Sequence, residues 1–222
     1  MAFTDYINVT YDVFSTSYSI KNALNSLSSY SLLSFDTESR SVYTKEERKE
    51  AKQLLKAPED LTHEDRILLK QVQESSGLSY PSLVKCTHIQ FGISETHSYV
   101  FICYDAHTEV MVFNWLVAHP ETKFIVHNAM HDFKLALHRT NTIPTNFFDT
   151  QLAIRTLTNH SEVWKAKAGL KDLMGTYYHP EWAVDTDYEV ANLKDKNFLR
   201  YAAIDTCATY KLYNLIQEQI ND

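Results

Sequence analysis

Short apolar runs, separated by polar residues, recur through the first part of the chain, and this pattern is typical of β-strands. A buried strand is predicted at 32–39 (LLSFDTES). The runs 84–94 and 97–104 are separated by a short polar link, which predicts an antiparallel pair. Two further strands are predicted at 6–14 and 123–127.

Apolar residues spaced three and four apart predict helices in much of the rest of the chain. The helices are expected at 19–30, 110–118, 129–139, 150–157 and 170–177, and from 193 to the C-terminus. Strands therefore come first, with helices interleaved and then dominant. This order predicts an α/β fold in three layers, in which helices cover a mixed sheet.

Residues 44–75 interrupt this pattern with a highly charged segment that contains no glycine and favours helix. Pro58 divides it, and each half opens with an N-terminal capping signal, Thr44 with Glu47 and Thr62 with Asp65. A helical hairpin is therefore predicted as an insertion at about 43–80. Two interpretations stay open for it: a solvated decoration, or an arm that binds a partner or guides a substrate strand.

Composition and length set the class of protein. The chain has 222 residues, 44% of them hydrophobic, which is enough for one large domain or two small ones. Its three cysteines are widely spaced, so neither a disulfide framework nor a structural zinc cluster is expected. No apolar run approaches the ~20 residues of a membrane span, and residues 1–14 lack the layout of a signal peptide. A soluble, cytoplasmic protein is expected.

Acidic residues supply the candidate chemistry. Asp36 and Glu38 end the strand at 32–39, and side chains two apart in a strand point to the same face. Their charges repel each other at the rim of an apolar strand, where screening is poor. The net charge of −7 gives no sign of a basic coat for nucleic acid, but a bound cation would reverse the local sign of such a cluster.

Three other stretches place polar side chains where strands end or helices begin. HNAMHDF holds Asn128 and Asp132 about one helical turn apart, and RYAAIDT holds Tyr201 and Asp205 on one helical face. In FFDTQL, Asp149 opens a helix and is interpreted as its N-cap. Taken alone, Asn128 would likewise be the N-cap of the helix that follows it.

A counter-charge is needed if four carboxylates converge in one pocket, those of Asp36, Glu38, Asp132 and Asp205. Their hard oxygen atoms suit Mg²⁺ or Mn²⁺ better than zinc. Two such ions roughly 3.5–4 Å apart would hold a phosphodiester for in-line attack by water. His127 and His131 have zinc-protease spacing, but HNAMH lacks the glutamate of that motif, so catalytic zinc is not expected.

The series D-x-E, N-x-x-x-D and Y-x-x-x-D, in this order, resembles the DEDD superfamily of 3′–5′ exonucleases. Tyrosine four residues before the last aspartate marks the tyrosine-containing branch, and Arg200 stands where the sister branch has histidine. FDTES, HNAMHDFKLAL, FFDTQLA, GLKDL and YAAIDT look most like the proofreading domain of bacterial DNA polymerase I, and ribonuclease D shares much of this pattern. The resemblance implies a ribonuclease H-like fold. Residues 1–222 would form one exonuclease domain with the hairpin inserted.

The resemblance also implies a role for each motif residue, with Asp36, Glu38, Asp132, Tyr201 and Asp205 as the catalytic set. Asp36 would bridge two Mg²⁺ or Mn²⁺ ions. Glu38 and Asp205 would hold the first ion, and Asp132 would support the second. Tyr201 would orient the attacking water. Substrate contacts would fall on Thr37, Asn128, Val42 and His131, the last standing where polymerase-type motifs have tyrosine or phenylalanine.

Four residues outside these positions carry open interpretations. Lys171 in GLKDL is interpreted as a surface residue, with contact to phosphate as the alternative. Tyr177, Tyr178 and Trp182 are candidates for stacking on bases, with core packing as the alternative.

The predicted function is metal-dependent hydrolysis of DNA from single-stranded or frayed 3′ ends to nucleoside monophosphates. The chain ends where such a nuclease domain ends, so no fused polymerase is expected. Proofreading in trans for a separate polymerase and free-standing DNA repair or degradation both fit, in a bacterial or virus-infected cell. Two alternatives stay open: a ribonuclease D-like exoribonuclease acting on RNA, and a catalytically silent module that binds nucleic acid or protein.

Overall fold

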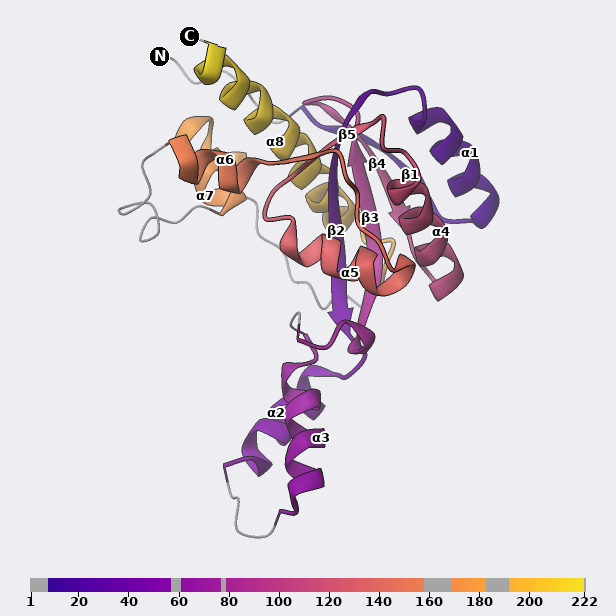
Figure 1. Ribbon diagram of the computed structural model, residues 1–222, viewed down its shortest axis with the longest axis vertical. Helices are drawn as coiled ribbons and strands as arrows, with labels where there is room; N and C mark the ends of the chain where they lie inside the picture. The colour runs from indigo at the N-terminus through magenta and orange to yellow at the C-terminus, as the bar shows by residue number, and fades with distance from the viewer. Residues whose placement is uncertain (1–7, 57–60, 77–78, 158–168, 183–191, 222) are drawn as a thin grey trace. The chain divides into compact units, whose positions relative to one another are not determined.

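The computed structural model describes residues 8–56, 61–76, 79–157, 169–182 and 192–221. Its contacts divide the chain into two units, residues 1–38 with 87–222 and residues 39–86. The first unit contains most of the β-sheet and the helices that cover it, and the second contains a helical hairpin (Figure 1).

In the described residues, six strands form one sheet in the order β1-β4-β3-β2-β5-β6. The strands are β1 Thr10–Phe14, β2 Leu32–Ser41, β3 Val84–Gly92, β4 His97–Ile102, β5 Lys123–Val126 and β6 Phe147–Asp149. β3 and β4 are antiparallel, as predicted, whereas β1 pairs with β4, β2 with β5 and β5 with β6 in parallel. The carboxyl ends of β2 and β5 therefore lie at one edge of the sheet, where ligand sites of α/β folds gather.

Helices cover both faces of the sheet (Figure 1). The α-helices of the first unit are α1 Ser17–Leu27, α4 Ala106–Val117, α5 Met130–Thr140, α6 Thr150–Leu157, α7 Leu170–Tyr177 and α8 Lys196–Asn221. Short 3₁₀ helices occupy Pro81–Leu83 and Pro180–Trp182. No described helix is both long and apolar enough to cross a membrane.

Each face of the sheet has its own packing. On one face Trp115 of α4 places its ring against Phe91 of β3 and Phe124 of β5. On the other face Leu199 and Ala203 of α8 pack against β4. α1 and α5 contact α4, and α6 and α7 contact α8, so each layer has several helices. The predicted three-layer α/β fold with a mixed sheet is confirmed.

Gly92 at the end of β3 lets α8 approach the sheet closely. A Cβ atom added there would collide with Oγ of Ser34 and lie 3.1 Å from the backbone oxygen of Thr206. The Ser34 hydroxyl donates to that oxygen at 2.7 Å, and the hydroxyls of Ser98 and Thr206 share a hydrogen bond of 2.8 Å. These contacts fix the position of α8 against β2 immediately beside Asp205.

A buried ion pair joins α5 to α4. Nε of Arg139 lies 2.8 Å from Oε1 of Glu109, whose side chain is almost fully buried. Breaking a buried pair leaves an uncompensated charge, so this contact helps to hold α5 in place. α5 in turn carries Asp132 in its first turn.

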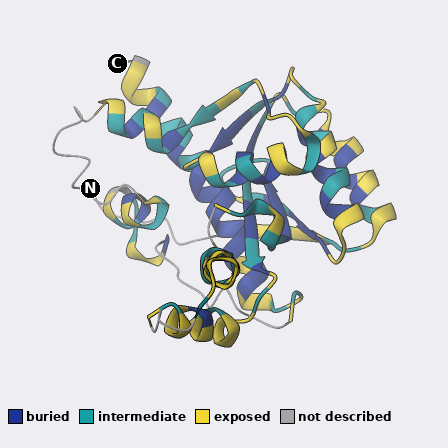
Figure 2. Cartoon of the chain, turned by 60° about the horizontal axis from the view of Figure 1, so that its bottom comes forward, coloured by how far each residue is buried: buried dark blue, intermediate teal, exposed yellow. Residues whose placement is uncertain are grey.

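The second unit contains the predicted hairpin of α2 (Lys45–Leu54) and α3 (His63–Glu74). Both predicted capping boxes are present: the hydroxyls of Thr44 and Thr62 accept hydrogen bonds from the backbone N–H three residues on. Ala51 of α2 is buried, whereas no residue of α3 is, and most of both helices is exposed (Figure 2). Pro58 lies outside the described residues.

Several boundaries differ from the predicted ones. α4 begins at Ala106 rather than at 110, because the Asp105 side chain accepts from the Thr108 N–H at 2.7 Å and caps the helix. The three-residue strand β6 was not predicted. α8 begins at Lys196 rather than at 193, and the predicted first strand begins at Thr10, with residues 6–7 outside the described part.

Candidate active site

A cleft of about 220 Å³ opens where β2 and β5 end. Its lining comes from β2, from the turn after β5, from α5 and from α8, and consists of Asp36, Thr37, Glu38, His127, Asn128, His131, Asp132, Tyr201 and Asp205. Every site residue predicted from the sequence except Val42 therefore borders one cleft. Residues up to 169 positions apart, Asp36 and Asp205, meet there because the topology brings their elements to one edge of the sheet.

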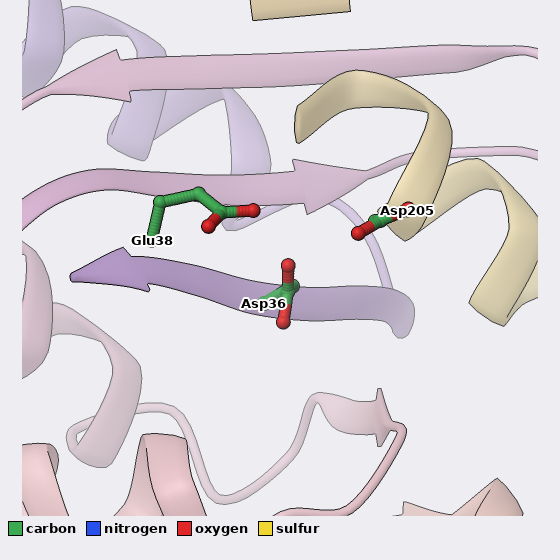
Figure 3. A group of neighbouring side chains, drawn as sticks. All are labelled: Asp36, Glu38 and Asp205. Atoms are coloured by element: carbon green, nitrogen blue, oxygen red, sulfur yellow. The ribbon is translucent and has the colours of Figure 1, made fainter. Parts of the chain in front are cut away.

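β2 contributes the first two carboxylates. Ser34, Asp36 and Glu38 alternate with apolar Phe35 and with Thr37, so these three side chains share one face of the strand. The hydrogen bond from Ser34 to Thr206 shows that this is the face covered by α8. Asp36 and Glu38 accordingly point into the space that α8 borders (Figure 3).

α8 contributes Tyr201 and Asp205, which lie one helical turn apart and are both buried. Oxygen atoms from the carboxylates of Asp36, Glu38 and Asp205, one from each, all lie within 4.8 Å of one another (Figure 3). A partly buried group of hard oxygen atoms at this spacing is the ligand set that Mg²⁺ or Mn²⁺ prefers.

Asp132 brings a fourth carboxylate from the first turn of α5. The Thr37 hydroxyl donates to Oδ1 of Asp132 at 2.5 Å, and both side chains are buried. Thr37 lies between Asp36 and Glu38 on β2, so this bond ties α5 to the strand that carries the first two acids. The four carboxylates thus converge as predicted.

Asp149 holds the turn that presents Asn128 and Asp132. Its carboxylate accepts from the backbone N–H of Asn128 at 3.2 Å and of Ala129 at 2.9 Å. It also accepts from the N–H of Gln151 at 2.9 Å, which confirms its predicted capping of α6. Asn128 itself has a φ of 63°, a left-handed conformation that asparagine tolerates better than most residues.

Burial and mutual repulsion raise the pKa values of the clustered acids. The pKa of Asp36 is well above its ordinary 3.8 because of burial first, and then because of the charges of Asp132, Glu38 and Asp205. The pKa of Glu38 is also raised, by burial first and then by Asp205 and Asp132. Burial raises the pKa of Asp132 to about 7, against the lowering effect of the Thr37 hydrogen bond. Divalent cations would favour the ionised forms of all these groups, so the cluster fits metal ions.

Lys171 at the start of α7 places a positive charge beside the cleft. Its Nζ lies 4.4 Å from the centre of the Tyr201 ring, and its charge lowers the pKa of Glu38. The interpretation of Lys171 as a plain surface residue was therefore incomplete. The spacing of GLKDL gave no signal for this, because the contact depends on how α7 packs on α8.

Several other interpretations need correction. The N-cap of α5 is Ala129, so Asn128 is not a cap; its exposed side chain lines the cleft instead. Trp182 is buried in the core with Met174, which excludes it as a platform for base stacking. Tyr178 packs against the same core, and its hydroxyl donates to the Lys211 backbone oxygen at 3.2 Å, which favours the core-packing alternative for this residue. The side chain of Tyr177 lies outside the described part.

His127, His131 and Val42 complete the set of predicted positions. Nδ1 of His127 and the Thr150 hydroxyl share a hydrogen bond of 2.9 Å. His131 lines the cleft, and its pKa is lowered by burial first and then by the charge of Lys134. Val42 belongs to the second unit and is 54% exposed, and its predicted contact with substrate stays a prediction.

Comparison with known proteins supplies the relatives of this chain. A family model described as 3′–5′ exonuclease matches residues 73–221. Similar solved structures include Brucella melitensis NrnC with bound Mg²⁺ (15% identity, TM-score 0.59, covering 96% of this chain and 82% of that one). They also include Escherichia coli RNase D (14% identity, TM-score 0.58, covering 96% of this chain and 46% of that one). A third is the catalytic core of RRP6 from Trypanosoma brucei (12% identity, TM-score 0.64, covering 99% of this chain and 49% of that one). A comparison with curated sequences gives no match.

The sheet order, the two helical layers and the acidic cleft define an α/β enzyme of the ribonuclease H-like exonuclease class. The chain belongs to the 3′–5′ exonuclease family, whose model covers more than half of its length. It is a 3′–5′ exonuclease, and its cluster of Asp36, Glu38 and Asp205 could hold a divalent metal ion.

Proposed function

We propose that the protein removes nucleoside monophosphates from the 3′ end of single-stranded nucleic acid, using two Mg²⁺ or Mn²⁺ ions held by the four carboxylates of the cleft. The observation that carries this proposal is the group of Asp36, Glu38 and Asp205 oxygen atoms within 4.8 Å, with Asp132 beside them. Burial and mutual repulsion disfavour the ionised forms of these acids, so a bound cation would be needed to keep them all charged.

The placement of the acids supports a division of labour. Asp36 lies within reach of the charges of Asp132, Glu38 and Asp205, and by the motif resemblance it would be the residue shared by both ions. Glu38 and Asp205 would complete the first site, and Asp132 the second. When bound, such a pair supplies a hydroxide nucleophile near neutral pH and stabilises the leaving oxygen.

The remaining residues would position the reactants. Tyr201 borders the cleft one turn before Asp205, where its hydroxyl would orient the attacking water. Thr37, Asn128 and His131 would contact the 3′-terminal nucleotide from the opposite wall. Water then adds to the last phosphodiester, the P–O bond to the 3′ oxygen of the penultimate nucleotide breaks, and that oxygen takes up a proton.

DNA is the substrate that the motif resemblance to polymerase I favours. RNA is the second candidate, because the solved structures with this fold include RNase D, described as an exoribonuclease involved in structured RNA processing, and NrnC bound to pGG. The two substrates differ in the 2′-hydroxyl, which a protein can read directly.

A time course on matched 5′-labelled DNA and RNA strands, with Mg²⁺, Mn²⁺ or EDTA, tests both the metal dependence and the choice of substrate. We expect a ladder that shortens from the 3′ end with either ion and no cleavage in EDTA. Faster turnover of RNA would move the assignment to the second candidate. Cleavage in EDTA, or products from internal cuts, would contradict the proposed function.

A further inference from the structure

Gln90 in β3 is a buried polar side chain that the proposed site does not use. Its exposure is 0%, and neither Nε2 nor Oε1 has a hydrogen-bond partner in the described structure. A buried amide without a partner destabilises a fold, since it has lost its hydrogen bonds to water and gained none. A glutamine at such a position points to a partner that binds there.

Contacts between β2 and β3 fix which residues face each other. The Ser34 hydroxyl lies 3.5 Å from the Gly92 carbonyl oxygen, and an added Cβ on Gly92 would collide with that hydroxyl. Toward the other end of the pair, the Thr87 hydroxyl donates to the Glu38 carbonyl oxygen at 3.1 Å. Residue numbers therefore rise along one strand as they fall along the other, and the pairing is antiparallel.

This register places Gln90 opposite Asp36. Both lie two residues from the Ser34–Gly92 pair, in opposite directions, and on the same face of the sheet. Cross-strand neighbours of this kind have Cβ atoms roughly 4.5–5.5 Å apart, within reach of a glutamine side chain.

α8 packs on the face of the sheet to which Gln90 and Asp36 point. It passes Gly92 at Thr206 and His88 at Phe198, whose ring centre lies 4.8 Å from that of the histidine. The segment of α8 between these contacts carries Tyr201 and Asp205. Gln90 is therefore enclosed between the strand that carries Asp36 and the helix that carries Asp205.

We propose that Gln90 is a positioning residue for the metal-binding carboxylates. Its amide N–H group would donate to a carboxylate oxygen of Asp36 or Asp205 when the ions draw these side chains into their binding arrangement. Partners of this kind orient acidic ligands and are known to affect metal affinity. The inference rests on the proposed function, because it assigns Gln90 to the same ions.

Gln90→Met, which keeps the length of the side chain and removes the amide, tests the proposal. We expect the melting temperature of the EDTA-treated protein to stay the same or rise, because an unpartnered buried amide is lost. Affinity for Mn²⁺ by calorimetry should fall about tenfold or more, and kcat should fall with KM little changed. Gln90→Asn, which retains an amide N–H donor on a shorter side chain, should keep more metal affinity than Gln90→Met.

Thr122→Val is the matched control, because Thr122 is also buried but its hydroxyl donates to the Tyr30 backbone oxygen at 3.1 Å, at the amino end of β5 and away from the cleft. It should lower the melting temperature and leave Mn²⁺ affinity unchanged. Unchanged Mn²⁺ affinity and kcat in Gln90→Met would overturn the positioning role while leaving the proposed function intact. A wild-type protein that binds no Mn²⁺ would instead overturn the proposed function itself.

A second and independent observation concerns charge on the hairpin. Lys45, Lys49, Lys52 and Lys56 recur at helical spacing along α2 and the turn after it, and all are exposed; we name them the lysine face. At about 100° per residue they lie within one stripe, and the acidic residues of α2 lie outside it. None of the four forms a hydrogen bond or ion pair with another described residue.

Like charges three and four residues apart destabilise a helix, so this arrangement favours a polyanion as its partner. We infer that the lysine face binds the phosphate backbone of single-stranded nucleic acid. The rise of 1.5 Å per residue spaces the lysines roughly 4.5–6 Å apart along the axis, on the scale of successive phosphates in an extended strand. This inference also rests on the proposed function, since the bound strand is the substrate class of the enzyme.

A triple variant tests the lysine face by changing Lys45, Lys49 and Lys52 to glutamine. The matched control is a double variant on the same helix, Glu46→Gln with Glu50→Gln. Binding of a labelled single strand is measured in EDTA over a series of salt concentrations. We expect the lysine variant to bind at least several-fold more weakly, with a log–log salt slope less steep by about 2. The control should bind as tightly as the wild type or more tightly.

Cleavage of a dinucleotide separates this inference from the proposed function. A dinucleotide has no phosphates beyond those in the cleft, so it cannot also contact the lysine face. The lysine variant should cleave it at the wild-type rate. Equal affinity and equal salt slope for the long strand would overturn the inference and would favour an acidic protein surface as the occupant. A wild type that cleaves no substrate would overturn the proposed function.

Discussion

Asp36 lies among three other carboxyl groups, and their charges add to the effect of burial on its pKa. Asp36→Asn keeps the shape of the side chain and removes its charge. We predict that turnover falls by at least roughly 10²-fold, because an essential ligand is weakened. The same change should raise the melting temperature in EDTA at pH 8, because a repelling charge is gone. Exposed Glu121→Gln is the control and should change neither quantity.

Lys171 exerts its effect through Glu38, whose pKa its positive charge lowers. In Lys171→Met that pKa rises, and because a metal ion needs the ionised carboxylate, the pH midpoint for Mn²⁺ binding should shift upward. Titration of Mn²⁺ at a series of pH values measures this shift. Lys171→Arg keeps the charge and should keep the midpoint, whereas identical midpoints in all three proteins would show that the charge has no such role.

Among single residues, the sequence identified the acids well and the groups around them poorly. The four acids stand out because Asp36 and Glu38 pair with each other at strand spacing, while Asp132 follows Asn128 and Asp205 follows Tyr201 at helix spacing. Gln90 has no such mark. It sits in an ordinary apolar strand, and its importance depends on a cross-strand neighbour more than 50 residues away.

Helices and strands were predicted where local signals are strong. The capping boxes of α2 and α3 specify their starts, and α6 and α7 match their predicted bounds. The start of α4 was missed because its first turn has little apolar periodicity and depends on the Asp105 cap. β6 was missed because a three-residue strand is defined by its partner β5, not by its own pattern.

The packing of α8 against the sheet depends on Gly92. In Gly92→Ala the new methyl group meets Oγ of Ser34 and the Thr206 backbone, so either α8 or β2 must shift. We predict a loss of about 1–3 kcal/mol in the free energy of unfolding, measured by urea denaturation, and reduced turnover. Adding Ser34→Ala removes one collision and should recover part of the loss. Full stability in Gly92→Ala alone would show that the close approach is not required.

The chain as a whole should respond to pH through its acidic cleft. The fold raises the pKa of Asp132 from 3.8 to about 7, so the native state keeps a proton that the unfolded chain releases over this range. The contribution of Asp132 to the stability of the metal-free protein should therefore be greatest near pH 4 and should fall as the pH rises toward 7. Asp36 and Glu38 shift in the same direction.

Melting temperatures in EDTA from pH 4 to pH 8 measure this dependence, with Asp132→Asn as the comparison. The variant lacks the titrating carboxyl group, so its decline with pH should be shallower. Saturating Mg²⁺ should reverse the decline in the wild type, since the ions bind the ionised groups. A wild-type stability that rises between pH 4 and pH 7 without metal, relative to Asp132→Asn, would contradict the raised pKa.

The central question for the whole molecule is whether the converging acids hold a pair of ions. Anomalous scattering from crystals soaked in Mn²⁺ answers it directly. We expect two peaks roughly 3.5–4 Å apart in the cleft, with Asp36 in contact with both. An absence of ions from the cleft at saturating Mn²⁺, or peaks confined to other surfaces, would contradict the two-metal proposal.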